Sequence, residues 1–210
     1  MHIPGLTLFG FEKQSAMKKI ILTIFLGFIL QHNLFSQGCL PNGITFTTQS
    51  QIDSFAIVYP GCTEIEGMIY IKGEDITNLD GLSVITSIGE DLYIGSDYWD
   101  YGVNKKLTSI EGLSNLTFIG GSLYINGPVL ESLNGLESLT RIEESLVIGP
   151  AYWEYGVNSS LTSIEGLGNI TYIGGTINIR NSPVLESLAG LGGLTTIQGS
   201  LILGGYGGGL

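Results

Sequence analysis

Two near-identical segments of the chain, YWDYGVN and YWEYGVN, carry side chains suited to holding a ligand. The aromatic residues in these segments are Tyr98, Trp99, Tyr101, Tyr152, Trp153 and Tyr155. Both tryptophans of the chain are among them, and such rings combine a large apolar area with a polar atom. They either grip a sugar chain or an extended peptide, or pack on the protein's own surface. The sequence leaves both interpretations open.

Few residues of the chain suit catalysis or metal binding. The chain has 2 histidines, His2 and His32, and both lie in an N-terminal segment that we expect to be removed. Their loss excludes a Ser-His-Asp triad, a Cys-His pair and a His-ligated metal. Calcium could use clustered carboxylates, but no D-x-D-x-D-G loop is present, so we expect a solvated acidic surface. We predict no catalytic residue, no metal site and no cofactor. The clustered carboxylates are Glu90, Asp91, Asp97, Asp100, Glu143, Glu144 and Glu154.

The net charge argues against nucleic acid as a partner. The 210-residue chain carries 8 Lys+Arg and 19 Asp+Glu, a formal charge of −11. From Gln37 onward 5 basic and 18 acidic side chains remain, which makes the net charge −13. A phosphate-binding surface needs clustered Lys and Arg. We therefore expect no nucleic-acid partner.

The N-terminal region has the composition of a secretory signal peptide. Met17-Lys18-Lys19 precedes the apolar run IILTIFLGFIL, and small and polar residues follow up to Ser36. This order is typical of export signals, and the run is shorter than the ~20 residues that span a membrane. We predict a signal peptide at 17–36, a secreted or cell-surface location, and no transmembrane segment in the mature chain. Residues 1–16 do not fit a signal start and are interpreted as a doubtful upstream extension.

The remaining part of the chain, 64–210, is a repeat. Units of 23 or 24 residues alternate with units of 31 residues, which the two aromatic segments lengthen. Each unit contains a period-2 apolar pair, typical of a half-buried strand. A second pair at the L-x-x-L spacing follows, and a third apolar line joins consecutive units. Because no single unit buries three apolar lines alone, we expect the units to stack as coils. The period-2 pairs are Ile69/Ile71, Leu92/Ile94, Leu123/Ile125, Leu146/Ile148, Ile177/Ile179 and Leu201/Leu203.

A glycine keeps register with these apolar lines. It precedes the second apolar residue of the L-x-x-L pair in five units: Gly81, Gly112, Gly135, Gly166 and Gly190. We expect at this position either a corner with positive φ or an approach of neighbouring coils too close for a Cβ atom.

The middle residue of each period-2 pair should face outward. The residues at this position are Tyr70, Tyr93, Tyr124, Val147, Asn178 and Ile202. A strand face rich in Tyr suits contact with a protein or a glycan. Tyr and Val also favour exposed strand positions without any ligand, so this face too has a purely structural alternative.

The repeat skeleton resembles a known family. LTSIEGLSNLTFIGGSLYI at 107–125 and LTSIEGLGNITYIGGTINI at 161–179 are similar to the receptor L-domain family, in particular its bacterial secreted members. The resemblance extends over about 39–203 and implies a mainly β fold, a right-handed parallel β-helix of leucine-rich-repeat-like coils. It says little about function, because such solenoids bind many ligands. Since the last unit stops early, we expect the array to be truncated and further coils to follow residue 210.

A cap is predicted at 37–63, before the first coil. Thr48 and Gln51 fit a capping box, and a helix after them would cover the open end of the stack. Its apolar face is predicted to consist of Ile52, Phe55, Ala56 and Tyr59. Cys39 and Cys62, the 2 cysteines of the chain, flank this segment. In an exported protein we expect them to form a disulfide; a lipid on Cys39 or free thiols are the alternatives.

The leading functional hypothesis is a non-enzymatic extracellular binding or adhesion module for a protein or glycan. A structural spacer within a larger surface protein is the first alternative. A polysaccharide-active enzyme is the second, and it is disfavoured because neighbours such as Glu143 and Glu144 would point to opposite faces of a strand.

Overall fold

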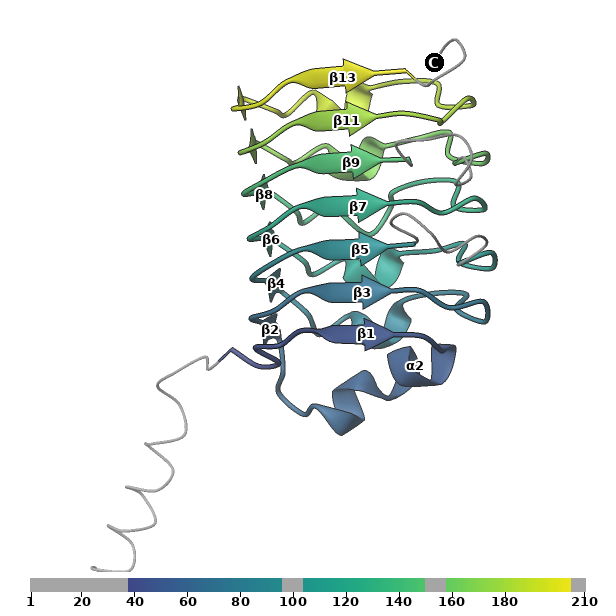
Figure 1. Cartoon of the computed structure of the whole chain (residues 1–210), viewed down its shortest axis with the longest axis vertical. Helices are drawn as coiled ribbons and strands as arrows, with labels where there is room; N and C mark the ends of the chain where they lie inside the picture. The colour runs from purple at the N-terminus through teal and green to yellow at the C-terminus, as the bar shows by residue number, and fades with distance from the viewer. Residues whose placement is uncertain (1–37, 96–103, 150–157, 205–210) are drawn as a thin grey trace, which may run out of the picture. The chain divides into compact units, whose positions relative to one another are not determined.

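The computed structural model of the chain describes residues 38–95, 104–149 and 158–204. In this part the backbone forms two parallel β-sheets, of seven and six strands, and one α-helix. The seven-stranded sheet is the stack of long arrows in Figure 1. In spatial order its strands are β1 (Ile44–Phe46), β3 (Ile69–Ile71), β5 (Leu92–Ile94), β7 (Leu123–Ile125), β9 (Leu146–Ile148), β11 (Ile177–Ile179) and β13 (Leu201–Leu203). The expectation of a mainly β fold is confirmed.

The six-stranded sheet consists of two-residue strands, each placed shortly before a strand of the larger sheet. Its strands are β2 (Glu64–Ile65), β4 (Ser87–Ile88), β6 (Phe118–Ile119), β8 (Arg141–Ile142), β10 (Tyr172–Ile173) and β12 (Thr196–Ile197). Short 3-10 helices, η1 (Asp80–Leu82), η2 (Glu111–Leu113), η4 (Glu165–Leu167) and η5 (Ala189–Leu191), return the chain to it. We call one such circuit, for example β4, β5 and η2, a coil.

The core lies between the two sheets and the 3-10 helices. Parallel pairing puts like residues of successive coils side by side, as in Leu92↔Leu123 and Ile94↔Ile125. From β3 to β11 these inward side chains are at most 2% exposed. In β13, however, Leu201 is 55% exposed, because no described strand lies on its far side. The predicted columns are therefore continuous up to the last described coil.

The glycine column is explained by close approach. A Cβ at Gly112 would lie within 3.0 Å of the Leu79 carbonyl in the preceding coil, and the other four glycines face a backbone carbonyl in the same way. Only Gly135 of these five has a positive φ, +108°. The positive-φ alternative is thus wrong for the column as a whole, and contact between backbones is the physical cause.

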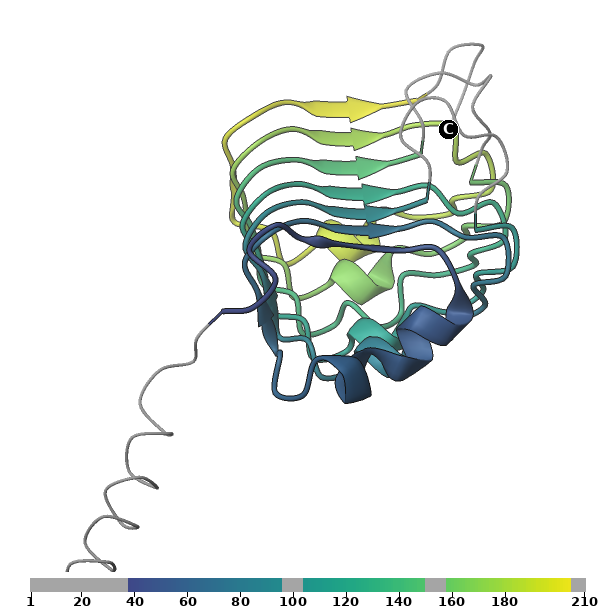
Figure 2. The same cartoon turned by 60° about the horizontal axis from the view of Figure 1, so that its bottom comes forward.

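The N-terminal cap is the helix α2 (Gln49–Val58). The Thr48 side chain accepts a hydrogen bond from the Gln51 N–H, and the Gln51 side chain accepts one from the Thr48 N–H, so the predicted capping box is confirmed. Ile52 and Phe55 are buried, whereas Ala56 is exposed, contrary to the prediction. The helix lies across one end of the stack (Figure 2) and packs mainly on η1.

Cys39 and Cys62 form the predicted disulfide, with 5.7 Å between their Cα atoms. Cys39 forms a β-bridge with Ile65 of β2, and Cys62 lies between α2 and β2. The cap is thereby tied to the first coil. The predicted extension at 1–16 and signal peptide at 17–36 lie outside the described residues.

Candidate binding face

The outward face of the seven-stranded sheet brings the predicted tyrosines into one row. Their strand neighbours on both sides are buried in the core, so the middle residues point away from it. Strand pairing places these middle residues side by side in the order Thr45, Tyr70, Tyr93, Tyr124, Val147, Asn178 and Ile202. All but the exposed Thr45 are half-buried.

The three tyrosine rings stack on one another. The ring centroids of Tyr70 and Tyr93 are 5.0 Å apart with an interplanar angle of 13°. Those of Tyr93 and Tyr124 are 4.3 Å apart, and the planes differ by 3°. The Lys72 Nζ lies 4.8 Å from the Tyr70 ring centroid. Both faces of the Tyr93 ring are therefore covered by tyrosines, and the stack presents ring edges and hydroxyl groups outward.

The central tyrosine is also held by an acid. The Tyr93 hydroxyl donates a hydrogen bond of 3.1 Å to Asp91 Oδ2. Partial burial, and then the nearby Tyr124 and Asp91, raise the pKa of Tyr93 well above its ordinary value. The shift favours the neutral phenol, which is the form that donates the hydrogen bond to Asp91.

A ladder of side chains runs along the entry to the larger sheet. Asp91 Oδ1 accepts a hydrogen bond of 2.6 Å from the Ser122 N–H of the next coil. The Ser122 Oγ accepts from the Ser145 N–H at 3.1 Å, and the Ser145 Oγ accepts from the Thr176 N–H at 3.1 Å. Each coil therefore fixes the entry of the next one, which sets the register of the tyrosine row.

The aromatic segments attach beside this row. The first follows Gly95, directly after β5, and ends at Asn104; the second follows Gly149, directly after β9, and ends at Asn158. The predicted ligand residues inside them lie outside the described residues, so the structure places only their points of attachment. These residues are Tyr98, Trp99, Tyr101, Tyr152, Trp153 and Tyr155.

Two buried asparagines secure the segments where they rejoin the coils. Asn104 is 0% exposed; its Oδ1 accepts from the Gly73 N–H at 3.0 Å, and its Nδ2 donates to the Ile71 carbonyl at 2.9 Å. Asn158 makes the same two kinds of contact, to Gly127 and Ile125. In the sequence these asparagines are the last residues of the aromatic segments, and no separate role is predicted for them. Their recurrence as the last residue of both segments was the available signal.

The six-stranded sheet carries a smaller cluster. The Arg141 guanidinium lies 3.7 Å from the Tyr172 ring centroid, and its Nε donates to Glu143 Oε1 at 2.5 Å. The hydrogen bond with Arg141 lowers the pKa of Glu143, and the same bond raises that of Arg141. Glu143, one of the clustered carboxylates of the sequence, is therefore committed to an ion pair.

Metal-binding clusters and membrane-spanning helices were also sought in the part of the chain that the structure describes. Within the described residues, no three Asp, Glu, Cys or His side chains are arranged to hold a metal ion. No helical segment in 38–95, 104–149 or 158–204 has the length and hydropathy needed to cross a bilayer.

Comparison of the chain with protein-family models, with curated proteins and with solved structures gave no match. The resemblance noted in the repeat sequence therefore stays a prediction, and the functional argument depends on the geometry of the chain itself.

Proposed function

We propose that the chain is a non-enzymatic extracellular binding module that offers the outward face of the seven-stranded sheet to a protein ligand. In this proposal the stacked coils are a right-handed parallel β-helix of the receptor L-domain type. The parallel strand order and the agreement of all predicted strand pairs with observed strands support this assignment.

The observation that carries the proposal is the tyrosine stack of Tyr70, Tyr93 and Tyr124. Tyrosine is enriched at protein interfaces because it combines apolar area with a hydroxyl group. Ordering a free side chain on binding costs about 0.5–1.5 kcal/mol. In this stack the rings already hold one another, and Asp91 holds Tyr93. The conformational entropy of these side chains is therefore largely lost on folding, and little more would be lost when a ligand binds.

The same geometry favours a protein over a glycan on this face. Sugars contact aromatic rings through the ring face, and both faces of Tyr93 are covered. Ring edges and hydroxyl groups remain, and these suit the mixed apolar and polar surface of a polypeptide. If the ligand is a glycan, we expect it to bind the two aromatic segments, because these contain Trp99 and Trp153, the two tryptophans of the chain.

Export to the cell surface or medium is part of the proposal. The Cys39–Cys62 disulfide supports it, because disulfides persist in oxidising compartments. The predicted signal peptide at 17–36 supports it independently.

The proposal is tested by screening the protein against arrays of secreted proteins and of glycans. We compare the wild type with a face variant, Tyr93→Ser/Tyr124→Ser, and with a segment variant, Trp99→Ala/Trp153→Ala. We expect protein ligands to be lost in the face variant. The matched control is Tyr172→Ser, which removes a half-buried aromatic ring from the other sheet.

The outcomes separate the hypotheses. Glycan binding lost only in the segment variant would move the site to the aromatic segments. Binding that is unchanged in both variants would refute a role for either surface. An absence of ligands on both arrays would favour the structural spacer. Circular dichroism on each variant establishes that the fold is retained.

A further inference from the structure

Carboxylates border the tyrosine row at the edge where the strands of the larger sheet begin. Asp91 directly precedes β5, and its Oδ2 accepts the hydrogen bond of the Tyr93 hydroxyl. Glu144 lies two residues before β9 and is exposed, as Glu90 is before β5. The backbone joins these positions: the Gly121 N–H donates to the Glu90 carbonyl, and the Glu144 N–H donates to the Gly121 carbonyl. Glu90, Gly121 and Glu144 are therefore neighbours along this edge.

Two of these carboxylates meet at one buried serine. The Ser122 N–H donates to Asp91 Oδ1 at 2.6 Å, and the Ser122 hydroxyl donates to Glu144 Oε2 at 3.2 Å. Ser122 is 2% exposed and directly precedes β7, the strand of Tyr124. Gly121, which lies between the two acids along the edge, has no side chain that would separate them. Ser122 is thus flanked by carboxylates from the coils on both sides.

The described segments that form this edge contain no Lys or Arg; they are 89–95, 120–126 and 143–149. Lys72 and Arg180 directly follow β3 and β11, so they lie at the opposite edge of the sheet, where the strands end. From Gln37 onward the chain has 18 acidic and 5 basic side chains. Because like charges close together repel and the field of the whole chain is negative, the edge beside Ser122 attracts a positively charged group.

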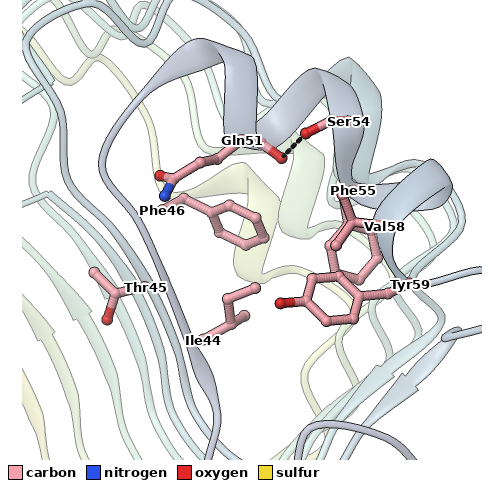
Figure 3. Close-up of a pocket in the computed structure, with 8 residues that line it drawn as sticks. All are labelled: Ile44, Thr45, Phe46, Gln51, Ser54, Phe55, Val58 and Tyr59. Carbon is pink, nitrogen blue, oxygen red and sulfur yellow. Dashed lines mark hydrogen bonds between the residues drawn. The ribbon is translucent and has the colours of Figure 1, made fainter.

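The cavity between α2 and β1 differs from this edge in charge. Figure 3 shows its lining side chains, none of which is charged. The Phe46 ring lies there with its centroid 5.8 Å from that of Phe55, so the protein's own side chains already fill part of the space. The cavity therefore offers no counter-charge to a cation, and it serves as an internal comparison for a charged ligand.

We propose that the protein ligand of the tyrosine row is basic and that it places an arginine between Asp91 and Glu144 at the edge of the row. This inference rests on the proposed function and names the chemistry of its partner. The guanidinium carries several N–H donors in a planar fork, which suits two carboxylates held on different coils. Its aliphatic stem would lie against the edges of Tyr93 and Tyr124. The negative field of the whole chain would speed the encounter with such a ligand.

The probe is the synthetic peptide GLRGLRGLRG. Its control is the same peptide with citrulline, a neutral analogue of nearly the same shape, in place of each arginine. Binding to the ¹⁵N-labelled, disulfide-bonded protein is followed by amide chemical shifts. We expect the arginine peptide to shift the amides of 91–93 and 122–124 with a dissociation constant of about 1 mM or tighter, and the citrulline peptide to bind about tenfold more weakly. Added salt should weaken the arginine peptide, because Glu144 is exposed to solvent.

A matched pair of variants separates this edge from the general negative charge of the chain. Glu144→Gln removes one charge and keeps an oxygen that accepts from Ser122. The control, Glu165→Gln, removes one charge from an exposed glutamate of η4. We expect Glu144→Gln to weaken binding of the arginine peptide about fivefold, and the control to change it less than about twofold. The face variant Tyr93→Ser/Tyr124→Ser should weaken binding as well, because it removes the surface under the arginine stem.

The outcomes distinguish this proposal from the function on which it rests. Equal binding of the two peptides, equal effects of Glu144→Gln and Glu165→Gln, or shifts confined to the cavity of Figure 3 would overturn it. Binding that depends on the tyrosines but not on Glu144 would overturn the basic partner and leave the tyrosine row as a binding face. Binding that depends on Glu144 but not on the tyrosines would refute the proposed function of the row, and this contact with it. The amide spectrum of each free variant establishes whether the fold is intact.

Discussion

Replacing the buried Asn104 by alanine should destabilise the protein far more than an ordinary surface substitution does. The side chain fills a position that short coils leave to glycine, as at Gly73 and Gly127, and it bridges two successive coils. Its loss would leave the buried Gly73 N–H without a hydrogen-bond partner.

The magnitude follows from the contacts. Alanine would leave the Gly73 N–H unpaired, and a buried unpaired group costs about 1–3 kcal/mol, whereas the Ile71 carbonyl would keep the hydrogen bond from the Gly95 N–H. Asn104 also has a φ of +57°, a left-handed conformation that costs other residues about 1–2 kcal/mol. We expect the free energy of unfolding to fall by about 2–5 kcal/mol. Asn104→Gly should recover the backbone part of this loss and retain the rest.

Urea unfolding followed by circular dichroism provides the measurement. The matched control is Asn115→Ala: Asn115 is exposed, and its Nδ2 donates a 2.8 Å hydrogen bond to the Ser83 carbonyl. Because water can replace this bond, the control should lose no more than about 1 kcal/mol. Equal losses in Asn104→Ala and Asn115→Ala would refute the reasoning, since they would mean that burial of the amide bridge adds nothing.

Three further predictions concern other parts of the fold. Gly112→Ala should lower the free energy of unfolding, measured with urea, by about 1–3 kcal/mol, because the new Cβ would clash with the Leu79 carbonyl of the preceding coil. Gly168→Ala is the control: its Cβ would lie 3.1 Å from the nearest atom, the Glu165 carbonyl oxygen, and the loss should be under about 1 kcal/mol. Reduction of the Cys39–Cys62 disulfide, separated by 23 residues, should lower the free energy of unfolding by about 3 kcal/mol, and the double serine variant should match the reduced protein. The pKa of Tyr93 is raised in the folded state, so the phenol ionises at a lower pH in the unfolded chain than in the folded one. The free energy of unfolding therefore falls as the pH rises above about 10. The urea midpoint should therefore decrease between pH 9 and pH 11 more in the wild type than in Tyr93→Phe, and an equal decrease in both would contradict this.

The strands and the cap could be predicted because side chains that are buried on one face of a strand or helix must recur with the period of that element. Pairs such as Leu92/Ile94 can be inward on a strand only in alternation, and Thr48 with Gln51 can complete a helix terminus only at their spacing. Ala56 was misplaced because helical periodicity alone does not say how far the helix sinks into its contact. Here the helix lies across the end of the stack, so only the residues that face η1 and β1 are covered.

The hydrogen bonds between coils are harder to predict from the sequence than the apolar columns are. The Thr86 hydroxyl donates to the Thr63 carbonyl, and Thr117 to Thr86, in a ladder that Thr140, Thr171 and Thr195 continue. These threonines recur at one position of the repeat, but recurrence alone does not tell a hydrogen-bonding role from a surface residue. The stacking of Tyr70 on Tyr93 was equally hidden, because ring orientation depends on side-chain torsions that a pattern of residue types does not specify.

The polar ladders explain why the tyrosine row can serve as a rigid surface. Apolar columns alone tolerate small slips between coils, because dispersion contacts have little directionality. Hydrogen bonds are directional, so the Thr63–Thr86 ladder on one sheet and the Asp91–Ser122 ladder on the other fix each coil against the next. With both ends of a coil fixed in this way, Tyr93 and Tyr124 are held at 4.3 Å by the frame as well as by each other. A ligand that contacts this row therefore meets a surface organised by the repeat itself, and a change in a ladder residue such as Ser122 should weaken binding without touching the ligand.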